Sequence, residues 1–174
     1  MLSHDDPAII PYEFTKNACN YITETELSHK LETKVEHFSI YSHNVRILPG
    51  KWPEFSDFIG SIKNDSKFEF SVLALQEIWN VPPDSNFDLP GYHSLLYKTC
   101  DKSGTNCNVG GGIGIYIRKC FEFQSIPITF ASHIFEAQCV KLFLNNSSYV
   151  IICNIYRPQN GNLDIFNEYL KNFL

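Results

Sequence analysis

Three short segments place polar side chains directly after apolar stretches that have the composition of β-strands. They are S-H-N-V-R at residues 42–46, L-Q-E-I-W at residues 75–79 and N-I-Y-R-P at residues 154–158. Rigid strands hold the groups at their ends in fixed positions, and strand ends in a packed sandwich can meet around one cleft. The sequence therefore predicts one functional site built from three distant segments.

Glu77 is the residue of this set with the sharpest chemical meaning. A carboxylate directly after a buried strand is either a residue that begins a helix or a metal ligand. Hard divalent cations such as Mg²⁺ bind one or two carboxylates, keep several waters and complete their shell with substrate phosphate. On the residues alone, both interpretations of Glu77 stay open.

Asn44, Tyr156 and Arg157 each have a structural and a functional interpretation. Asn44 either caps a turn or orients a carboxylate or phosphate oxygen. Tyr156 either packs half-buried in the core or donates its hydroxyl to a phosphoryl oxygen that gains charge in the transition state. Arg157 either lies on the surface before Pro158 or binds a phosphate through two hydrogen bonds.

Hydrophobic periodicity predicts the elements that must position these residues. We expect strands at residues 38–44, 70–75, 93–98, 110–119, 136–144 and 148–156, the last two joined by a hairpin turn at 145–148. We expect a turn at residues 49–50, a helix that starts at Pro53, a loop over residues 80–91 and an amphipathic helix over residues 163–173. Because parallel strands need helical crossovers that the middle of the chain lacks, this order favours a layered α/β sandwich over a doubly wound parallel sheet.

The glycine run at residues 110–114 is not a dinucleotide-binding motif. Its spacing, G-G-G-I-G, does not match G-x-G-x-x-G, and the β-branched residues Ile113, Ile115 and Ile117 favour a strand where that motif must open a helix. We expect these glycines to allow close approach of strands or a bulge.

Length and composition indicate one globular domain with a core, since 44% of the 174 residues are hydrophobic. No apolar run is long enough to span a bilayer, and the N-terminus does not have the pattern of a secretory signal. We therefore expect an intracellular protein, nuclear or cytoplasmic, that does not bind membranes. With seven acidic residues and three lysines, residues 1–36 carry four of the five excess negative charges. We interpret them as an acidic leader that is partly helical, with a capping box at Thr23 and Glu26, and residues 37–174 as the main domain.

The six cysteines do not form a C-x-x-C pair, so a structural zinc site is not expected. Three of them lie in apolar stretches, and we expect small buried thiols there: Cys120, Cys139 and Cys153. Cys100 and Cys107 flank a polar loop, and free thiols are expected there as well.

Taken together, the three polar segments resemble the endonuclease/exonuclease/phosphatase superfamily, which has the DNase I-like, AP-endonuclease-like fold. The resemblance rests on F-S-I-Y-S-H-N-V-R-I-L, V-L-A-L-Q-E-I-W, L-P-G-Y, G-G-G-I-G-I-Y-I and Y-V-I-I-C-N-I-Y-R-P, and covers about residues 37–174. It is strongest to the endonuclease domains of non-LTR retrotransposons. The fold it implies is a DNase I-like α/β sandwich, of which these residues are the N-terminal part.

The resemblance implies Mg²⁺-dependent hydrolysis of a phosphodiester bond in DNA. Asn44 matches the asparagine that orders the metal site, Glu77 the metal-binding glutamate and Tyr156 the tyrosine that contacts the scissile phosphate. Arg157 lies where retroelement members carry an arginine, so it is expected to bind substrate. The implied partners are the DNA phosphate backbone and a reverse-transcriptase region of a longer polyprotein.

The chain also departs from the family pattern. After Tyr156 it has neither the G-D-x-N segment, which positions the attacking water, nor the S-D-H segment, which supplies an Asp and a His. Asp164 lies in the last helix without a preceding glycine, and His133 lies between strands, so neither is expected to substitute. We therefore expect an incomplete domain that is inactive as this chain. Two alternatives remain: a phosphatase of the same superfamily acting on lipid or inositol phosphates, and a non-enzymatic gene fragment.

Overall fold

The computed structural model describes Thr23, Glu26 and residues 38–99, 110–128, 135–145, 147–158 and 162–173. The predicted capping box is confirmed, because Glu26 N donates to Thr23 Oγ1 at 3.2 Å and Thr23 N donates to Glu26 Oε2 at 2.7 Å. The remainder of the predicted leader, Cys19, Cys100, Cys107 and His133 lie outside the described residues.

Four strands form the first sheet, in the order β1-β2-β4-β3. They are β1 (Ile40–Asn44), β2 (Val72–Gln76), β3 (Leu96–Lys98) and β4 (Ile113–Ile117). The β1 and β2 strands are parallel, and β4 is antiparallel to both β2 and β3. Helix α2 (Leu48–Ser66) provides the crossover that a parallel pair requires.

The start of α2 differs from the expectation of a turn followed by a helix at Pro53. The helix begins at Leu48, and Gly50 N and Lys51 N already donate to Ile47 O at 3.1 Å. Pro49 lies in the first turn, where a missing N–H removes no intrahelical hydrogen bond. Leu48 is fully buried and anchors this earlier start against the core.

Three antiparallel strands form the second sheet, in the order β5-β6-β7. They are β5 (Glu122–Ile126), β6 (Glu136–Phe143) and β7 (Tyr149–Tyr156). The predicted hairpin turn between β6 and β7 is confirmed: Leu144 N donates to Ser148 O at 2.9 Å, and Asn145 Oδ1 accepts from Ser148 N at 2.9 Å.

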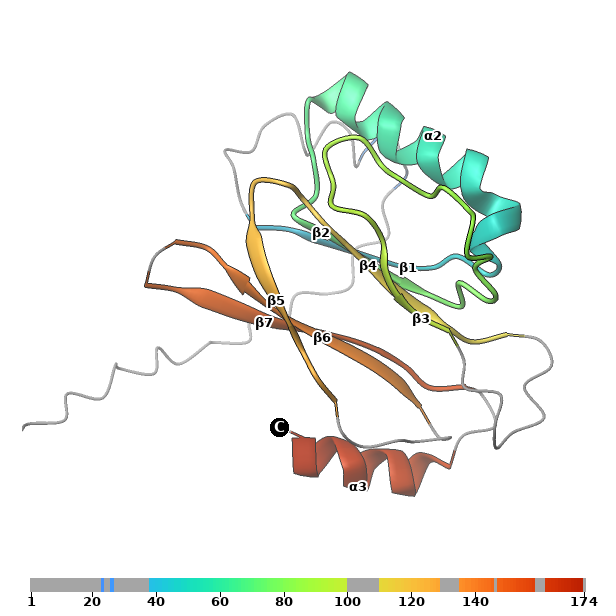
Figure 1. The fold of residues 1–174 in the computed structure, drawn as a ribbon, viewed down its shortest axis with the longest axis vertical. Helices are drawn as coiled ribbons and strands as arrows, with labels where there is room; N and C mark the ends of the chain where they lie inside the picture. Colours follow the sequence, from blue (N-terminus) through green and yellow to red (C-terminus); the bar gives the residue numbers. More distant parts are fainter. Residues whose placement is uncertain are drawn as a thin grey trace, which may run out of the picture.

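The two sheets pack face to face between helices, as Figure 1 shows. Six apolar residues fill the space between the sheets: Val72, Ile115, Ile117, Val140, Leu142 and Ile152. The opposite face of the first sheet packs against α2 through Phe55, Ile59 and Ile62. Helix α3 (Leu163–Phe173) lies on the outer side of the second sheet, where the rings of Phe166 and Phe135 are 5.4 Å apart. The predicted α/β class is confirmed.

The expectation of three buried thiols is wrong. Cys139 and Cys153 are directly opposite each other on β6 and β7 and form a disulfide, with their Cα atoms 4.3 Å apart. Cys120 is free but exposed. Cross-strand register, which brought the first two thiols together, is a property of the hairpin that the apolar context of single cysteines does not reveal.

None of the helices within the described ranges has both the length and the apolar composition needed to span a membrane.

Candidate functional site

The structure brings Asn44, Glu77 and Tyr156 together where β1, β2 and β7 end. Because β1 and β2 are parallel, with Asn44 opposite Gln76, their carboxyl ends share one edge of the sheet. The β7 strand of the second sheet ends at Tyr156. The Tyr156 hydroxyl donates to Glu77 Oε1 at 2.6 Å. The contact joins residues that are 79 positions apart in the sequence.

The backbone at Glu77 excludes the interpretation that this residue begins a helix. Residues 77–95, all of which the structure describes, contain no helix, so Glu77 does not begin one. Its φ is 53°, a left-handed conformation that is costly for any residue with a side chain. Ile47 N donates to Glu77 O at 2.9 Å and Trp79 N donates to Gly111 O at 2.8 Å, which holds the turn from both sides. The carboxylate is thus fixed by its backbone as well as by Tyr156.

Gly112 explains why glycines occur beside this turn. A Cβ at Gly112 would lie 2.9 Å from Ile78 Cγ1 and 3.1 Å from Trp79 O, and its φ is +82°. The close approach at this residue is to the turn after β2, not between two strands as the sequence suggested. The Gly112 N–H donates to Glu136 Oε2 at 2.6 Å.

A buried amide links the two sheets next to the site. Asn154 is 3% exposed, and its Nδ2 donates to Leu75 O at 2.9 Å and to Gly114 O at 3.1 Å. Its Oδ1 accepts from Gln76 Nε2 at 2.6 Å. Each polar atom of the Asn154 side chain therefore has a partner, so the amide can be buried without an uncompensated cost.

The surroundings of Glu77 favour its ionised form. The hydrogen bond from Tyr156 lowers the pKa of Glu77 most, and the amide of Asn44 and the positive charge of Arg46 lower that pKa further. Partial burial raises the pKa of Glu77, but by less than these contacts lower it. The Trp79 indole lowers the pKa of Glu77 least. The site presents a negative charge near neutral pH.

Arg157 makes a hydrogen bond to the neighbouring backbone. It follows Tyr156 directly, its side chain is half-buried, and its Nη1 donates to Pro158 O at 3.2 Å. Its assignment to phosphate binding stays a prediction.

Sequence reasoning did not identify three residues of the site: Arg46, Glu136 and Asn154. Arg46 and Asn154 lie inside the polar segments at residues 42–46 and 154–158, but their residue types alone predicted no role. Glu136 is opposite Tyr156 in the β6–β7 register, so the hairpin would have indicated it once its register was known. Asn154 precedes Tyr156 by two residues, which places both side chains on the same face of β7.

The donor set can fit a hydrated Mg²⁺ but not a cage made of protein ligands. Within the described ranges, no group of three or more His, Cys, Asp and Glu side chains is placed to hold a metal ion. Mg²⁺ usually keeps several waters and needs only one or two carboxylates. An ionised Glu77 with an amide beside it meets that smaller requirement.

Comparison of the chain with models of protein families gives no match, and comparison with curated proteins gives none either.

Proposed function

We propose that residues 37–174 form part of a Mg²⁺-dependent phosphodiester hydrolase domain with the DNase I-like fold of the endonuclease/exonuclease/phosphatase superfamily. The observation that carries the proposal is the hydrogen bond from Tyr156 to Glu77, with Asn44 beside the same carboxylate. The motif resemblance assigns these three residues to one site, and they meet although Asn44 ends β1, Glu77 follows β2 and Tyr156 ends β7 in the other sheet. The proposed substrate is DNA, as in retrotransposon endonucleases.

In this proposal Glu77 is the protein ligand of Mg²⁺, which would supply positive charge to a phosphate oxygen during hydrolysis. Asn44 orients the Glu77 carboxylate, and the pKa-lowering contacts keep that carboxylate deprotonated and able to bind a cation. Tyr156 donates its hydroxyl to the carboxylate in the substrate-free chain, and in this proposal the same O–H would turn from Glu77 to a phosphate oxygen when substrate binds. Arg157 would pair its positive charge with a phosphate of the DNA backbone.

The 174 residues do not supply every group that the reaction needs. Residues 157–174 contain neither G-D-x-N nor S-D-H, and Asp164 lies in the first turn of α3. The motifs that supply the water-positioning group and the histidine in the family are thus not found in the sequence between Arg157 and Leu174. We expect the chain to bind Mg²⁺ at Glu77 but not to cut DNA. A reverse-transcriptase region in a longer polyprotein, and nuclear or cytoplasmic location, are part of the same proposal.

Two measurements on the 174-residue chain test the proposal. In the first, Mg²⁺ is titrated into ¹⁵N-labelled protein, and amide shifts near Glu77 are expected to saturate in the wild type and in Glu122→Gln but not in Glu77→Gln. Glu122 is a matched control because it is exposed on β5. Equal Mg²⁺ responses of the wild type and Glu77→Gln would refute the assignment of the metal ligand.

In the second measurement, supercoiled plasmid is incubated with the chain and Mg²⁺. We expect no nicked product above background. Nicking that disappears in Glu77→Ala would keep the nuclease assignment and disprove the expected lack of activity. Release of phosphate from inositol phosphates, lost in Glu77→Ala, would instead favour the phosphatase alternative. Reading the coding sequence past Leu174 for G-D-x-N and S-D-H gives a separate check.

A further inference from the structure

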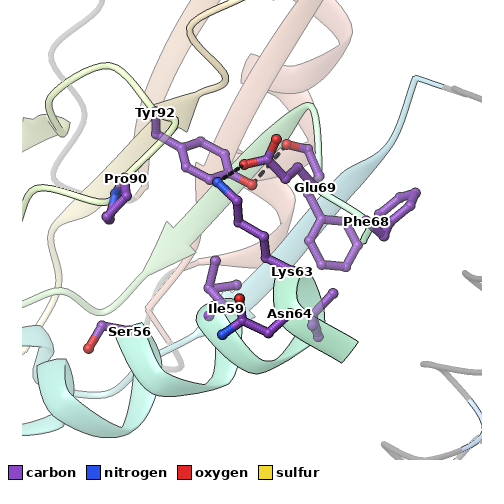
Figure 2. Close-up of a pocket in the computed structure, with 11 residues that line it drawn as sticks. Ser56, Ile59, Lys63, Asn64, Phe68, Glu69, Pro90 and Tyr92 are labelled. Carbon is purple, nitrogen blue, oxygen red and sulfur yellow. Dashed lines mark hydrogen bonds and ion pairs between the residues drawn. The ribbon is translucent and has the colours of Figure 1, made fainter. Parts of the chain in front are cut away.

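A pocket of about 290 Å³ lies between α2 and the segment that leads into β2. Figure 2 shows Lys63 and Ile59 on the helix, with Glu69, Phe68 and Tyr92 facing them across the space. Glu69 precedes β2 and Glu77 follows it, so the pocket and the candidate functional site lie at opposite ends of the same strand. Its volume is at the lower end of what small-molecule sites enclose, which suits a ligand of one ring.

The walls of the pocket are mainly apolar. Ile59 comes from α2, Phe68 and Phe70 from the segment before β2, and Tyr92 from the loop between β2 and β3. The Tyr92 hydroxyl is already committed, since it donates to Phe70 O at 3.0 Å. Tyr92 therefore offers mainly the face of its ring to a ligand, and an apolar body is the part of the ligand that these walls would bury.

Among the described residues, Lys63 and Glu69 are the charged side chains that line the pocket, and Arg118, outside the lining, reaches the same carboxylate. Glu69 is 2.7 Å from Lys63 Nζ and 3.1 Å from Arg118 Nη2, so one carboxylate is shared by two cations. An ammonium group has three donors, and the Lys63 side chain is 47% exposed. Lys63 can therefore bind an anion without leaving Glu69, whereas a cationic ligand would have to displace Lys63 from that carboxylate.

The pocket lining includes a glycine, Gly60, in the middle of a helix. It lies in the interior of α2, where glycine is destabilising relative to alanine. A Cβ at this position would meet nothing within 4 Å, so close packing does not demand a glycine. Gly60 lines the pocket, so we expect a bulky aromatic side chain at this position to fill it.

We propose that the pocket binds a small organic anion with one ring or a branched apolar body and a carboxylate group. The apolar body lies against Ile59, Phe70 and Tyr92, and the carboxylate pairs with Lys63. The site is separate from Glu77 and does not depend on the proposed hydrolase function.

Phenylacetate is a suitable probe, and 2-phenylethylamine has a similar ring and chain with the opposite charge. Each is titrated into the ¹⁵N-labelled 174-residue chain while amide chemical shifts are recorded. We expect phenylacetate to produce saturable shifts at Ile59, Lys63 and Phe70, and the amine to bind at least about tenfold more weakly, as loss of one charge-assisted hydrogen bond predicts. Equal binding of the two probes, or no saturable shift at these amides, would overturn the proposal.

Two pairs of variants locate the site. Gly60→Phe is expected to fill the pocket and abolish phenylacetate binding, while Gly60→Ala, which improves helix propensity and adds little volume, is expected to retain it. Lys63→Gln should weaken binding about tenfold, and Lys51→Gln, an exposed lysine elsewhere on α2, should not. The Lys63 pair keeps the test decisive if Gly60→Phe does not fold. Unchanged affinity in Lys63→Gln would refute the assigned carboxylate contact.

Discussion

Gln76 and Asn154 form an amide bridge between the two sheets, with Gln76 Nε2 donating to Asn154 Oδ1 at 2.6 Å. Gln76 comes one residue before Glu77, and Asn154 comes two residues before Tyr156. The bridge therefore fixes β7 against β2 directly beside the hydrogen bond from Tyr156 to Glu77. A buried amide whose polar atoms all have partners fixes the relative position of the two strands, because a shift of either strand would leave polar atoms unpaired.

Replacement of Asn154 should be strongly destabilising. In Asn154→Leu, the carbonyls of Leu75 and Gly114 lose the donor that Nδ2 provides, and the free energy of unfolding should fall by about 2–3 kcal/mol. Gln124→Leu, an amide-to-leucine change at an exposed position of β5, should alter it by less than about 0.5 kcal/mol. Urea unfolding followed by circular dichroism measures both. Equal stability of the two variants would contradict the role of the bridge.

Removal of the Tyr156 hydroxyl should raise the pKa of Glu77, because the hydrogen bond from Tyr156 is the largest cause that lowers it. The pKa can be followed through the ¹³C shift of the Glu77 carboxyl during a pH titration of Tyr156→Phe. Tyr149→Phe on the exposed part of β7 is the control and should leave that titration unchanged. A Glu77 titration that is identical in the wild type and Tyr156→Phe would show that the hydrogen bond is absent in solution.

Glu77 should also make stability depend on acid pH. Its pKa is lower in the folded chain than in the unfolded chain. The pKa of a glutamate in an unfolded chain is about 4.3. Ionised Glu77 therefore favours folding above the unfolded value, and this contribution is lost as the pH falls through the folded value. The stability difference between the wild type and Glu77→Gln should shrink over that acid range. Thermal melts of both proteins at a series of pH values measure this difference.

Substitution at Gly112 should disturb the turn at Glu77. Gly112→Ala combines a positive φ with contacts of 2.9 Å to Ile78 Cγ1 and 3.1 Å to Trp79 O. Gly110→Ala shares the positive φ, +113°, but its Cβ would meet nothing within 4 Å. Backbone strain should lower the free energy of unfolding of both variants by about 1 kcal/mol. The contacts should lower that of Gly112→Ala further. Chemical denaturation compares them, and equal losses would disprove the close approach.

The disulfide should be detectable without any functional assay. Alkylation of the folded chain without reductant, followed by peptide mass spectrometry, should modify the exposed Cys120 and leave Cys139 and Cys153 unmodified. Since the two half-cystines are 14 residues apart, reduction should lower the free energy of unfolding by about 3 kcal/mol in the chain-entropy description. Modification of Cys139 and Cys153 in the unreduced, folded chain would show that they are thiols.

Much of the fold follows from local pattern, and the errors have physical causes. The buried run that became β2 and the β6–β7 hairpin were predictable because burial and turn chemistry leave strong local signals. β5 was not predicted because its residues alternate weakly, with Glu122, Gln124 and Ser125 exposed. The start of α2 was misplaced because Pro49 and Gly50 suggest a turn, yet the first helical turn tolerates them when a buried Leu48 anchors it.

For the candidate site, the sequence indicated Asn44, Glu77 and Tyr156 but not the residues that hold them. The first three follow strands and carry recognisable chemistry. Asn154 and Glu136 act through register between strands that are distant in the sequence, and that register is set by the tertiary fold. The helix-start interpretation of Glu77 could be rejected only when the following residues were seen to form a loop.

Four of the five described residues other than glycine with positive φ lie in the turns around Glu77: Arg46, Ile47, Glu77 and Trp79. Each would be relieved of strain by glycine. Directed evolution that rewards thermal resistance alone should therefore accumulate glycine or asparagine in these two turns before most other positions. The variants that best survive heating would then be the ones in which the carboxylate has lost its fixed orientation.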